Sequence, residues 1–418
     1  MGGVSMEWKE VRLGDVCEIK HGFAYKGKYF SDTPTCDILV TPGNFTLSGG
    51  FKLDKPKFYN GPVEKDYILS KGDLIVTMTD LSKNIDTLGY SALVPEVKGL
   101  TFHHNQRIGL VENIANNVDK YFLYWIMRTP AYQSFIATHS SGTTVHHTSP
   151  KGIGNYIFKL PPLDDQRRIA SILSSLDRKI ELNNKINADL EEMAQAIFKN
   201  WFVDFEPFKD GKFVDSELGM IPEGWKVGRL DEIADVVGGS TPSKAKPEYY
   251  TQKGIAWLTP KDLSNHPAVY TSRGEIDITE EGYNSTSTKL MPKGTVLFTS
   301  RAPIGYISIA QNDICTNQGF KSLVPKKAGT CFLYCFLKYV TPEIENKSTG
   351  STFKEASGSL MKSLQVIIPE QNVFEEFEAI VSPLFARIES LEKENSRLSL
   401  LRDTLLPRLM SGEIEIPE

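Results

Sequence analysis

The feature that most constrains the fold of this chain is that its sequence repeats itself once along most of its length. "WKEVRLGDVCEI" begins at Trp8 and "WKVGRLDEIADV" at Trp225. "KGDLIVTMTD" at Lys71 corresponds to "KGTVLFTSRA" at Lys293, and further matches follow in the same order. The spacing between partners drifts only slightly, as expected when loops differ in length. Such a long internal repeat indicates duplication of a whole structural unit rather than a short solenoid repeat.

Each copy is predicted to contain a globular domain followed by a long helix. We place the first domain at 6–163 and the second at 205–369, where turn residues separate short apolar runs such as "DLIVTM". That pattern is typical of a compact α+β domain. The clearest helix inside the first domain is expected at 118–136. The apolar period then lengthens, and long helices are predicted within 164–204 and 370–412.

The two long helices are predicted to pair antiparallel as a coiled coil. Their apolar residues recur about every 3.5 residues, the coiled-coil period, over about five heptads. The same pattern would also suit two amphipathic helices that each pack on their own domain. Asn187 and Asn395 occupy equivalent positions and interrupt the apolar seam. We therefore expect these two side chains to face each other near a pseudo-two-fold axis and to fix the register.

Composition and charge argue against a membrane protein but do not exclude a nucleic-acid-binding one. The chain has 40% hydrophobic and 24% charged residues, as soluble globular proteins do, and no apolar run approaches the ~20 residues of a membrane span. The net charge is −5, but the tail at 370–418 carries most of the acidic excess, so the domains can still present basic surfaces. The N-terminus does not resemble a signal peptide.

The five cysteines are odd in number and irregularly spaced, which favours reduced thiols in a cytoplasm. Cys331 and Cys335 lie four residues apart in "TCFLYCFLKY". Because their neighbours are apolar and no further Cys or His lies near them in sequence, we assign them to buried helix packing rather than to a metal site.

Several motifs, in this order along the chain, resemble the specificity subunit of a type I restriction–modification enzyme. Three surround the first long helix: "LPPLDDQRRIASIL" at 160–173, "IFKNWFVDFEPF" at 197–208 and "GMIPEGWKVGRL" at 219–230. "VLFTSRAPIGYISI" and "CTNQGFKSLV" lie inside the second domain, and "LLPRLMSGEIEI" closes the second long helix. The resemblance runs from Trp8 to about Ile416. The second domain departs from it by ending in "IIPEQNVFEEF", without the Leu-Pro-Pro-Leu and Arg-Arg of the first copy.

This resemblance implies a non-catalytic DNA-binding subunit with two target recognition domains, each reading one half of a split double-stranded DNA sequence. The long helices would set the spacer between the halves, which need not be palindromic because the two copies differ. The resemblance further implies two methylation subunits as partners and, through them, restriction subunits. No cofactor is implied for this chain itself. S-adenosylmethionine for adenine methylation, and ATP and Mg²⁺ for DNA translocation and cleavage, are expected on the partner subunits.

Loops of both domains carry the side-chain chemistry for DNA contact. Arg or Lys pairs with guanine and Asn or Gln with adenine in the major groove, whereas Lys, Arg, Ser and Thr position phosphates. From four such loops in each domain we predict DNA contacts for Lys26, Lys28, Asn44, Thr79, Lys83, Thr144, His147, Lys244, Lys246, Lys261, Arg301, Thr352 and Lys354. Arg301 lies in "SRAPIG", a string that the family shares across targets, so we expect a phosphate or scaffold role for it.

Asn105-Gln106 and Asn317-Gln318 occupy matching positions in the two copies. That symmetry favours hydrogen bonds that hold the structure over contacts to two different bases. The adjacent pairs His103-His104 and His146-His147 would point to opposite sides of a strand, which argues against a metal site.

The segment "HGFAYKGKYF", from His21 to Phe30, has the Gly-x4-Gly-Lys spacing of a nucleotide-binding P-loop. However, Tyr29 stands where a P-loop needs Ser or Thr to hold Mg²⁺, and the pattern predicts no strand–loop–helix unit around it. The second copy, "GGSTPSKAKPEYY" from Gly238, keeps a leading glycine, two lysines and closing tyrosines but loses the Gly-Lys pair. We interpret the segment as a flexible basic loop suited to a DNA backbone.

Three other functions are open from sequence. A methyltransferase acting alone would carry Asn/Asp-Pro-Pro-Tyr/Phe and Phe-x-Gly-x-Gly strings, which do not occur here, whereas the motif of a nuclease is too loose to exclude. A recognition subunit of another multi-subunit restriction system would share this architecture, and only the partner genes would discriminate. A coiled-coil scaffold would shift no DNA duplex even with a methylation partner.

Overall fold

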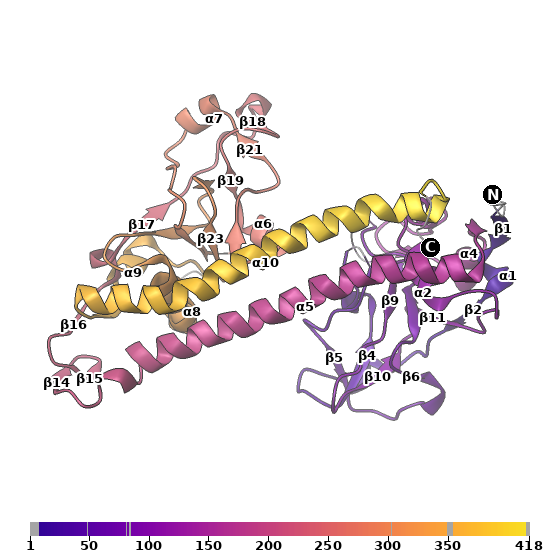
Figure 1. Cartoon of the computed structure of the whole chain (residues 1–418), viewed down its shortest axis with the longest axis horizontal. Coiled ribbons are helices and arrows are strands. Elements are labelled where there is room, and N and C mark those ends of the chain that lie inside the picture. Colours follow the sequence, from indigo (N-terminus) through magenta and orange to yellow (C-terminus); the bar gives the residue numbers. More distant parts are fainter. Residues whose placement is uncertain are drawn as a thin grey trace, which may run out of the picture. The chain divides into compact units, whose positions relative to one another are not determined.

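The chain divides into two compact units. In the computed structural model, unit 1 comprises the residues up to Lys179 and from Arg397 onward, and unit 2 comprises Ile180–Ser396 (Figure 1). The structure describes residues 8–47, 49–80, 82, 85–301, 303–348 and 354–414. Both boundaries fall inside the long helices that we predicted as separate spacer segments. Each long helix therefore contributes to the core of both units.

The central sheet of unit 1 is antiparallel and separates two hydrophobic cores. Its strands lie in the order β2 (Glu18–His21), β11 (Ile108–Glu112), β7 (Leu74–Thr77) and β9 (Ser91–Leu93). β7 is buried on both faces, so its sequence "LIVT" does not alternate between apolar and polar residues. Leu74 and Val76 pack into one core and Ile75 into the other, as the two-residue period of a strand requires.

The other strands of unit 1 form a second sheet and two short ladders. The second sheet has the order β3 (Phe30–Ser31), β5 (Lys57–Tyr59), β4 (Asp37–Val40), β10 (Thr101–His104) and β6 (Ile68–Leu69). Within it β4 and β10 are parallel. The ladders pair β1 (Lys9–Arg12) with β13 (Ile157–Leu160) and β8 (Thr79–Asp80) with β12 (His146–His147). Short 3-10 turns are η1 (Gly27–Tyr29), η2 (Pro42–Asn44) and η3 (Lys65–Tyr67).

The single helix predicted at 118–136 is two helices. The short helices of unit 1 are α1 (Leu13–Val16), α2 (Lys120–Ile126), α3 (Pro130–Thr138) and α4 (Pro150–Gly154). α3 begins at Pro130, and Thr129 caps it by accepting a hydrogen bond from the N–H of Tyr132 at 3.2 Å. A proline disfavours the helical conformation in the residue before it, and Thr129 is extended. The continuous apolar pattern concealed this break.

The central sheet of unit 2 confirms the internal repeat. Its strands lie in the order β17 (Ala234–Gly238), β25 (Lys321–Pro325), β22 (Val296–Ser300), β23 (Ile304–Ala310) and β20 (Tyr270–Thr271). The first four follow the order and the antiparallel pairing of β2, β11, β7 and β9 in unit 1. β19 (Trp257–Leu258) also pairs in parallel with β24 (Cys315–Thr316), as β4 does with β10.

The remaining elements of unit 2 surround this sheet. Further strand pairs are β14 (Phe213–Ser216) with β15 (Gly219–Pro222), β16 (Lys226–Arg229) with β26 (Gln365–Ile368), and β18 (Tyr250–Thr251) with β21 (Asp277–Ile278). The helices are α6 (Pro260–Asn265), α7 (Glu280–Asn284), α8 (Thr330–Lys347) and α9 (Gly358–Ser363), with 3-10 turns η4 (Glu206–Phe208), η5 (Leu230–Glu232) and η6 (Pro247–Tyr249). In both copies of the repeat, which begin at Trp8 and Trp225, the first strand, β1 or β16, pairs with the strand before the long helix.

The long helices α5 (Leu163–Phe202) and α10 (Gln371–Ser411) contact each other antiparallel within both units. In unit 1, Arg402 Nη1 donates to Asp177 Oδ1 at 2.7 Å. In unit 2, the rings of Phe198 and Phe377 lie 6.3 Å apart between centroids. Contacts later in α5 therefore involve earlier residues of α10. None of the described helices is long and apolar enough to cross a membrane.

Candidate nucleic-acid interface

The basic loop 22–30 of unit 1 is packed through its aromatic side chains and presents its lysines outward. Tyr25 is buried, and its ring meets two neighbouring aromatic rings edge-on at centroid distances of 5.1 and 5.0 Å. In η1, Lys28 Nζ lies 4.8 Å from the ring centroid of Tyr29. Lys26 and Lys28 are both exposed. Aromatic packing thus holds a turn whose two cations face solvent.

The basic loop 239–251 of unit 2 is built in the same way. Tyr249 is buried, and Lys246 Nζ donates to its hydroxyl oxygen at 2.8 Å while lying 4.9 Å from its ring centroid. That hydrogen bond raises the pKa of Lys246. Lys244 and Lys246 are exposed. In both units a 3-10 turn with a lysine over a tyrosine leads directly into a short strand, β3 or β18.

The P-loop spacing in the loop 22–30 does not build a nucleotide site. The preceding strand β2 pairs antiparallel with β11, and the element after η1 is a strand rather than a helix. Gly22 serves a different purpose, because a Cβ there would lie 2.1 Å from the carbonyl oxygen of Asn105. The loop is therefore docked at its first residues, by its backbone, on the turn between β10 and β11.

Thr79 and His147, both predicted to contact DNA, lie opposite each other in the β8–β12 ladder. Thr79 Oγ1 and His147 Nδ1 are 3.1 Å apart. Thr79 is only 4% exposed, so its hydroxyl orients the imidazole rather than reaching a ligand. His147 is exposed. The structure thus brings the two residues together and leaves His147 as the one that faces solvent.

Asp80 holds three of the described residues that follow β8. Its buried carboxylate accepts the N–H groups of Ser82, Thr87 and Leu88. Although burial favours the neutral acid, the hydrogen bonds from Ser82 and Thr87 lower the pKa of Asp80. Asp80 is therefore a structural anion that holds Ser82, Thr87 and Leu88 from inside the domain.

Arg301 and Glu355 occupy the equivalent ladder positions in unit 2. They form an antiparallel bridge, and Arg301 Nη1 lies 3.6 Å from Glu355 Oε2. Lys321 Nζ lies 3.6 Å from the other oxygen of that carboxylate. Lys354, beside Glu355, is exposed. The backbone arrangement of the ladder is therefore shared between the units, whereas the paired side chains differ in chemistry.

Asn44 does not reach the surface. It is 2% exposed, its Oδ1 accepts the N–H of Thr41 at 2.9 Å, and its Nδ2 donates to the carbonyl oxygen of Lys52 at 3.2 Å. In unit 2 the equivalent Asp262 accepts the N–H of Thr259 at 2.7 Å. The prediction of a DNA contact from Asn44 is wrong, because the side chain at this position closes its own turn.

The other predicted residues lie at exposed positions or outside the described residues. Thr144 is exposed in the loop closed by Ser141 and His147, whose backbones exchange hydrogen bonds of 2.9 and 2.8 Å. Lys261 is exposed, with its Nζ 3.6 Å from Glu275 Oε2. Lys83 and Thr352 are outside the described residues. DNA contact from the exposed residues stays a prediction.

The polar interruption of the helix pair lies one turn earlier in α5 than predicted. Asn395 Oδ1 accepts from Asn183 Nδ2, and Asn395 Nδ2 donates to Asn184 Oδ1, each at 2.8 Å. Asn187 Oδ1 is buried and has no hydrogen-bond partner among the described residues. The expected pairing of Asn187 with Asn395 is therefore replaced by one with Asn183 and Asn184. In an antiparallel pair, two residues related by the repeat face each other only at the midpoint of the pairing. Asn395 lies opposite Asn183 and Asn184 of α5 instead of Asn187.

Two lysines of unit 1 that sequence reasoning passed over resemble the predicted ones. Lys57 Nζ lies 4.2 Å from the ring centroid of Phe30, and Lys20 Nζ lies 4.9 Å from that of Tyr67. Lys57 begins "KFY" in β5, beside two aromatic residues. A search for lysines within aromatic-rich segments would have found it. Cation–π contacts of this kind hold an ammonium group near the surface without neutralising it.

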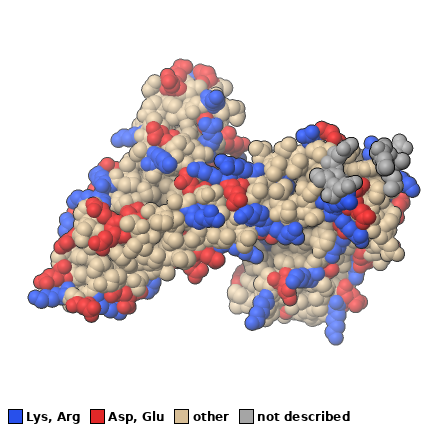
Figure 2. Space-filling model, in the orientation of Figure 1, with Lys and Arg blue, Asp and Glu red and all other residues tan. Residues whose placement is uncertain are grey.

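On the face of the molecule seen in Figure 2, the surface charges are of mixed sign. Figure 2 shows Lys and Arg interspersed with Asp and Glu over the visible face of both units. Any contact to a polyanion on this face would therefore depend on individually placed cations in the loops.

The histidine pair His103-His104 is used in local hydrogen bonds. His103 Nε2 lies 2.6 Å from Asp37 Oδ1, and His104 Nε2 lies 2.7 Å from the carbonyl oxygen of Ile108. Burial lowers the pKa of His104 to about 4, which keeps the ring neutral. Among the described residues, His, Cys, Asp and Glu form no group of three or more that is suited to a metal ion.

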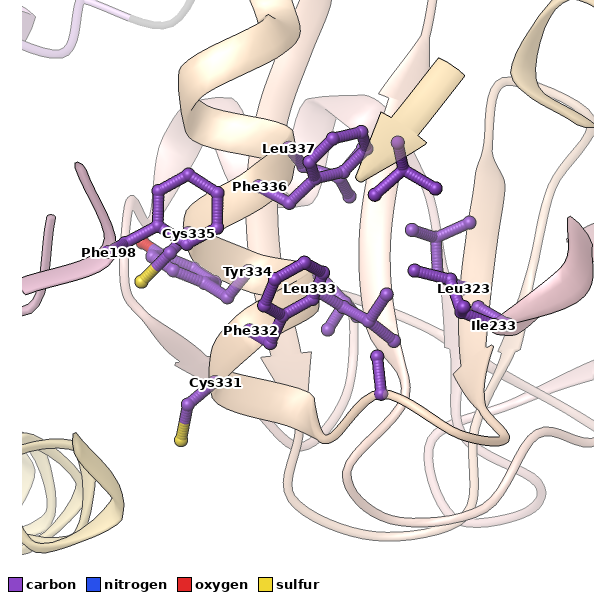
Figure 3. Packing of buried hydrophobic residues seen from close by; sticks show 14 of the residues in the cluster. Phe198, Ile233, Leu323, Cys331, Phe332, Leu333, Tyr334, Cys335, Phe336 and Leu337 are labelled. Carbon is purple, nitrogen blue, oxygen red and sulfur yellow. The ribbon is translucent and has the colours of Figure 1, made fainter. Parts of the chain in front are cut away.

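Cys331 and Cys335 are packing residues, as predicted. Both are buried on α8, and burial raises the pKa of each thiol well above its usual range. Figure 3 shows Leu323 of β25 on one side of α8 and Phe198 of α5 on the other. The first half of α8 is apolar on most of its circumference because it lies between the sheet and the long helices of unit 2.

Comparison with known proteins finds one family on both copies of the repeat. The sequence model described as "Type I restriction modification DNA specificity domain" matches residues 6–192 and 222–400. These two segments correspond to the two copies and together cover most of the chain.

Individual relatives are described as specificity subunits of type I restriction enzymes. The chain is 40% identical over 190 residues to the type I restriction enzyme MjaIX specificity subunit of Methanocaldococcus jannaschii, covering 45% of this chain and 44% of that protein. It is 27% identical over 481 aligned positions to the type I restriction enzyme HindI specificity subunit of Haemophilus influenzae, covering 98% of this chain and 100% of that protein.

The fold also has a relative among crystal structures. The S subunit of a type I restriction–modification system from M. genitalium superposes with a TM-score of 0.58 and 17% identity, over 98% of each chain. At that identity the likeness supports the fold alone.

Proposed function

The chain belongs to the type I restriction modification DNA specificity family, and from this premise we propose that it is the non-catalytic subunit that selects the DNA target of such a system. Each domain would read one half of a bipartite double-stranded sequence. Because the outward side chains of the two domains differ, the two halves would differ in sequence as well.

One observation carries this proposal: the two units present equivalent loops on the same backbone frame with different side chains. The ladder that pairs Thr79 with His147 in unit 1 pairs Arg301 with Glu355 in unit 2. The basic loops likewise share their build but place their lysines differently. Such an arrangement is expected of a chain that meets DNA twice and reads a different sequence each time.

We further propose that the long helices set the spacer between the half-sites. α5 has 40 residues, so it is about 60 Å long at ~1.5 Å per residue. That length exceeds one turn of DNA, about 34 Å. Deleting one heptad from both helices should shorten the spacer and leave the half-sites unchanged. A spacer of unchanged length in such a variant would refute the proposal that the long helices set it.

Docking of two methylation subunits, and of restriction subunits through them, is the third part of the proposal. Large apolar side chains remain exposed on the long helices: Leu182 and Met193 of α5 are 52% and 51% exposed, and Leu400 of α10 is 70% exposed. In this proposal the partner subunits would cover these side chains. S-adenosylmethionine, ATP and Mg²⁺ would then act on those partners.

The test is to coproduce the chain with its methylation subunits and to map methylation on a random-sequence DNA library. We expect methylated sites with two constant half-sites separated by a constant number of unspecified base pairs. The methylation subunits without this chain serve as the control and should show no such selection. A single contiguous target, or S-adenosylmethionine binding by this chain alone, would overturn the proposal.

A further inference from the structure

Each basic loop begins with a glycine that lies directly against a turn of its own unit. In unit 1, a Cβ on Gly22 would lie 2.1 Å from the carbonyl oxygen of Asn105. In unit 2, a Cβ on Gly239 would lie 2.1 and 2.3 Å from the carbonyl oxygens of Thr316 and Asn317. Neither glycine has a positive φ. These positions therefore require glycine for close approach, not for an unusual backbone conformation.

Backbone hydrogen bonds tie the residue after each glycine to the same turn. The N–H of Phe23 donates to the carbonyl oxygen of His104, and the N–H of Gln106 donates to that of Phe23, each at 2.9 Å. In unit 2, the N–H of Ser240 donates to the carbonyl oxygen of Thr316 at 3.0 Å. A side chain on either glycine would have to break these bonds.

The turn that receives the glycine is itself held by an asparagine in both units. Asn105 Oδ1 accepts the N–H of Arg107 at 3.1 Å, and Asn317 Oδ1 accepts the N–H of Gly319 at 2.8 Å. This confirms the expectation that these repeated asparagines hold structure. In unit 2 the neighbouring Gln318 also accepts a hydrogen bond from the hydroxyl of Thr241. We call each glycine with its asparagine turn a glycine clamp.

We propose that Gly22 and Gly239 are positioning residues for DNA recognition, each placing the lysine loop of its own unit and thereby serving one half-site only. The inference rests on the proposed function. Moving the added Cβ from 2.1 Å to an ordinary contact, which begins at 3.4 Å, requires the loop backbone to shift by more than about 1 Å, and a displacement of that size disables a preorganised polar site. The exposed lysines lie four to seven residues beyond each glycine, so they would move with it.

The experiment uses Gly22→Ala and Gly239→Ala in the complex with methylation subunits. Matched controls are Gly27→Ala, in the same loop, and Gly238→Ala, the neighbour of Gly239. A Cβ at these two positions would have its nearest contacts at 3.8 and 3.9 Å, which is ordinary packing. Methylation rates are measured on the full target and on two duplexes, each altered in one half-site.

We expect Gly22→Ala to reduce discrimination at one half-site by about tenfold and Gly239→Ala to do so at the other, within the range for lost base contacts. Both controls should stay within about twofold of wild type. If wild type shows no split target, the proposed function fails. If the target is split but the glycine variants behave like their controls, or reduce discrimination equally at both halves, the inference alone fails.

A second pair of variants covers the case in which a clamp variant does not fold. Thr241→Val removes the hydroxyl that donates to Gln318 without adding bulk, and Thr241→Ser restores it. Thr241→Val should weaken discrimination at the half-site affected by loop 239–251, and Thr241→Ser should resemble wild type. The proposed role of the glycine clamp would be refuted if Thr241→Val discriminated at both half-sites as wild type does. It would also be refuted if Thr241→Ser discriminated as poorly as Thr241→Val.

Discussion

Glu392 of α10 occupies a part of unit 2 where ionisation of its carboxyl is costly. Its two oxygens accept the N–H groups of Val269 at 2.7 Å and Tyr270 at 3.0 Å. Its pKa is raised to about 7: burial is the main cause, the two N–H bonds oppose it, and the nearby charge of Glu191 adds to it. Lys338 pairs with Glu191 at 2.7 Å. Replacing Glu392 by glutamine should therefore remove a pH-dependent penalty.

The size of the effect follows from the two pKa values. The rise from 4.5 to about 7 corresponds to about 3 kcal/mol. Because the folded pKa lies above the unfolded one, the stability is greatest below about pH 4.5 and falls as the pH rises to about 7. Glu392→Gln loses one acceptor oxygen, which costs about 1 kcal/mol. The variant should thus be more stable than wild type by about 2 kcal/mol at pH 8, and this advantage should vanish near pH 5.

Thermal unfolding at pH 5, 6, 7 and 8 measures this difference. For a unit of this size the expected gain in Tm at pH 8 is about 4–8 °C. Glu376→Gln is the matched control, since Glu376 is exposed on the same helix, and its Tm should follow wild type at every pH. The reasoning is refuted if the Tm of Glu392→Gln runs parallel to that of wild type from pH 5 to 8.

Removing single polar groups elsewhere should have effects of defined size. Asp177→Asn removes the carboxylate shared by the buried Arg128 and the partly buried Arg402 and should lower the free energy of unfolding by about 3 kcal/mol, measured by thermal unfolding. Asn44→Ala should cost about 1–2 kcal/mol through its lost cap, and an altered base preference in methylation mapping would contradict its structural role. Lys246→Gln should weaken DNA binding by the complex equally on cognate and scrambled duplexes and lower the salt slope by about 1. Fluorescence anisotropy at several salt concentrations measures that slope, and a loss confined to cognate DNA would make Lys246 a base reader.

The repeat made much of the fold predictable, because equivalent segments must form equivalent elements. The apolar run "DLIVTM" and its counterpart "TVLFTS" in the second copy are the equivalent strands β7 and β22, which lie inside the two central sheets. The order of the other strands could not be predicted, since it depends on pairing between segments far apart in sequence. The break between α2 and α3 was missed because apolar residues continue across Pro130 and concealed a local signal that the sequence contains.

The candidate site was harder to predict because the direction of a loop side chain depends on the turn that carries it. The side-chain amide of Asn44 could pair with adenine, but its Oδ1 already accepts the N–H of Thr41 and closes its own turn. The exposed lysines were identified from composition, whereas the buried tyrosines that hold them emerged only from packing. The repeat correctly predicted that an asparagine of α5 would pair with Asn395, but it predicted Asn187 instead of Asn183 and Asn184. The register of the two helices depends on how both domains pack against them, and the repeat does not specify that packing.

The residues that the two copies share and those in which they differ have different structural roles. A Cβ added to Gly22 or Gly239 would lie 2.1 Å from a backbone carbonyl oxygen, so neither glycine can be replaced without moving a loop. His147 and Lys354 point to solvent from equivalent loops, and exposed substitutions of that kind typically change stability by about 0.5 kcal/mol or less. A chain built on this plan can therefore alter its outward side chains, and with them its target, while the frame that positions them stays fixed. For the same reason, the frame identifies the family but carries no information about the bases that are read.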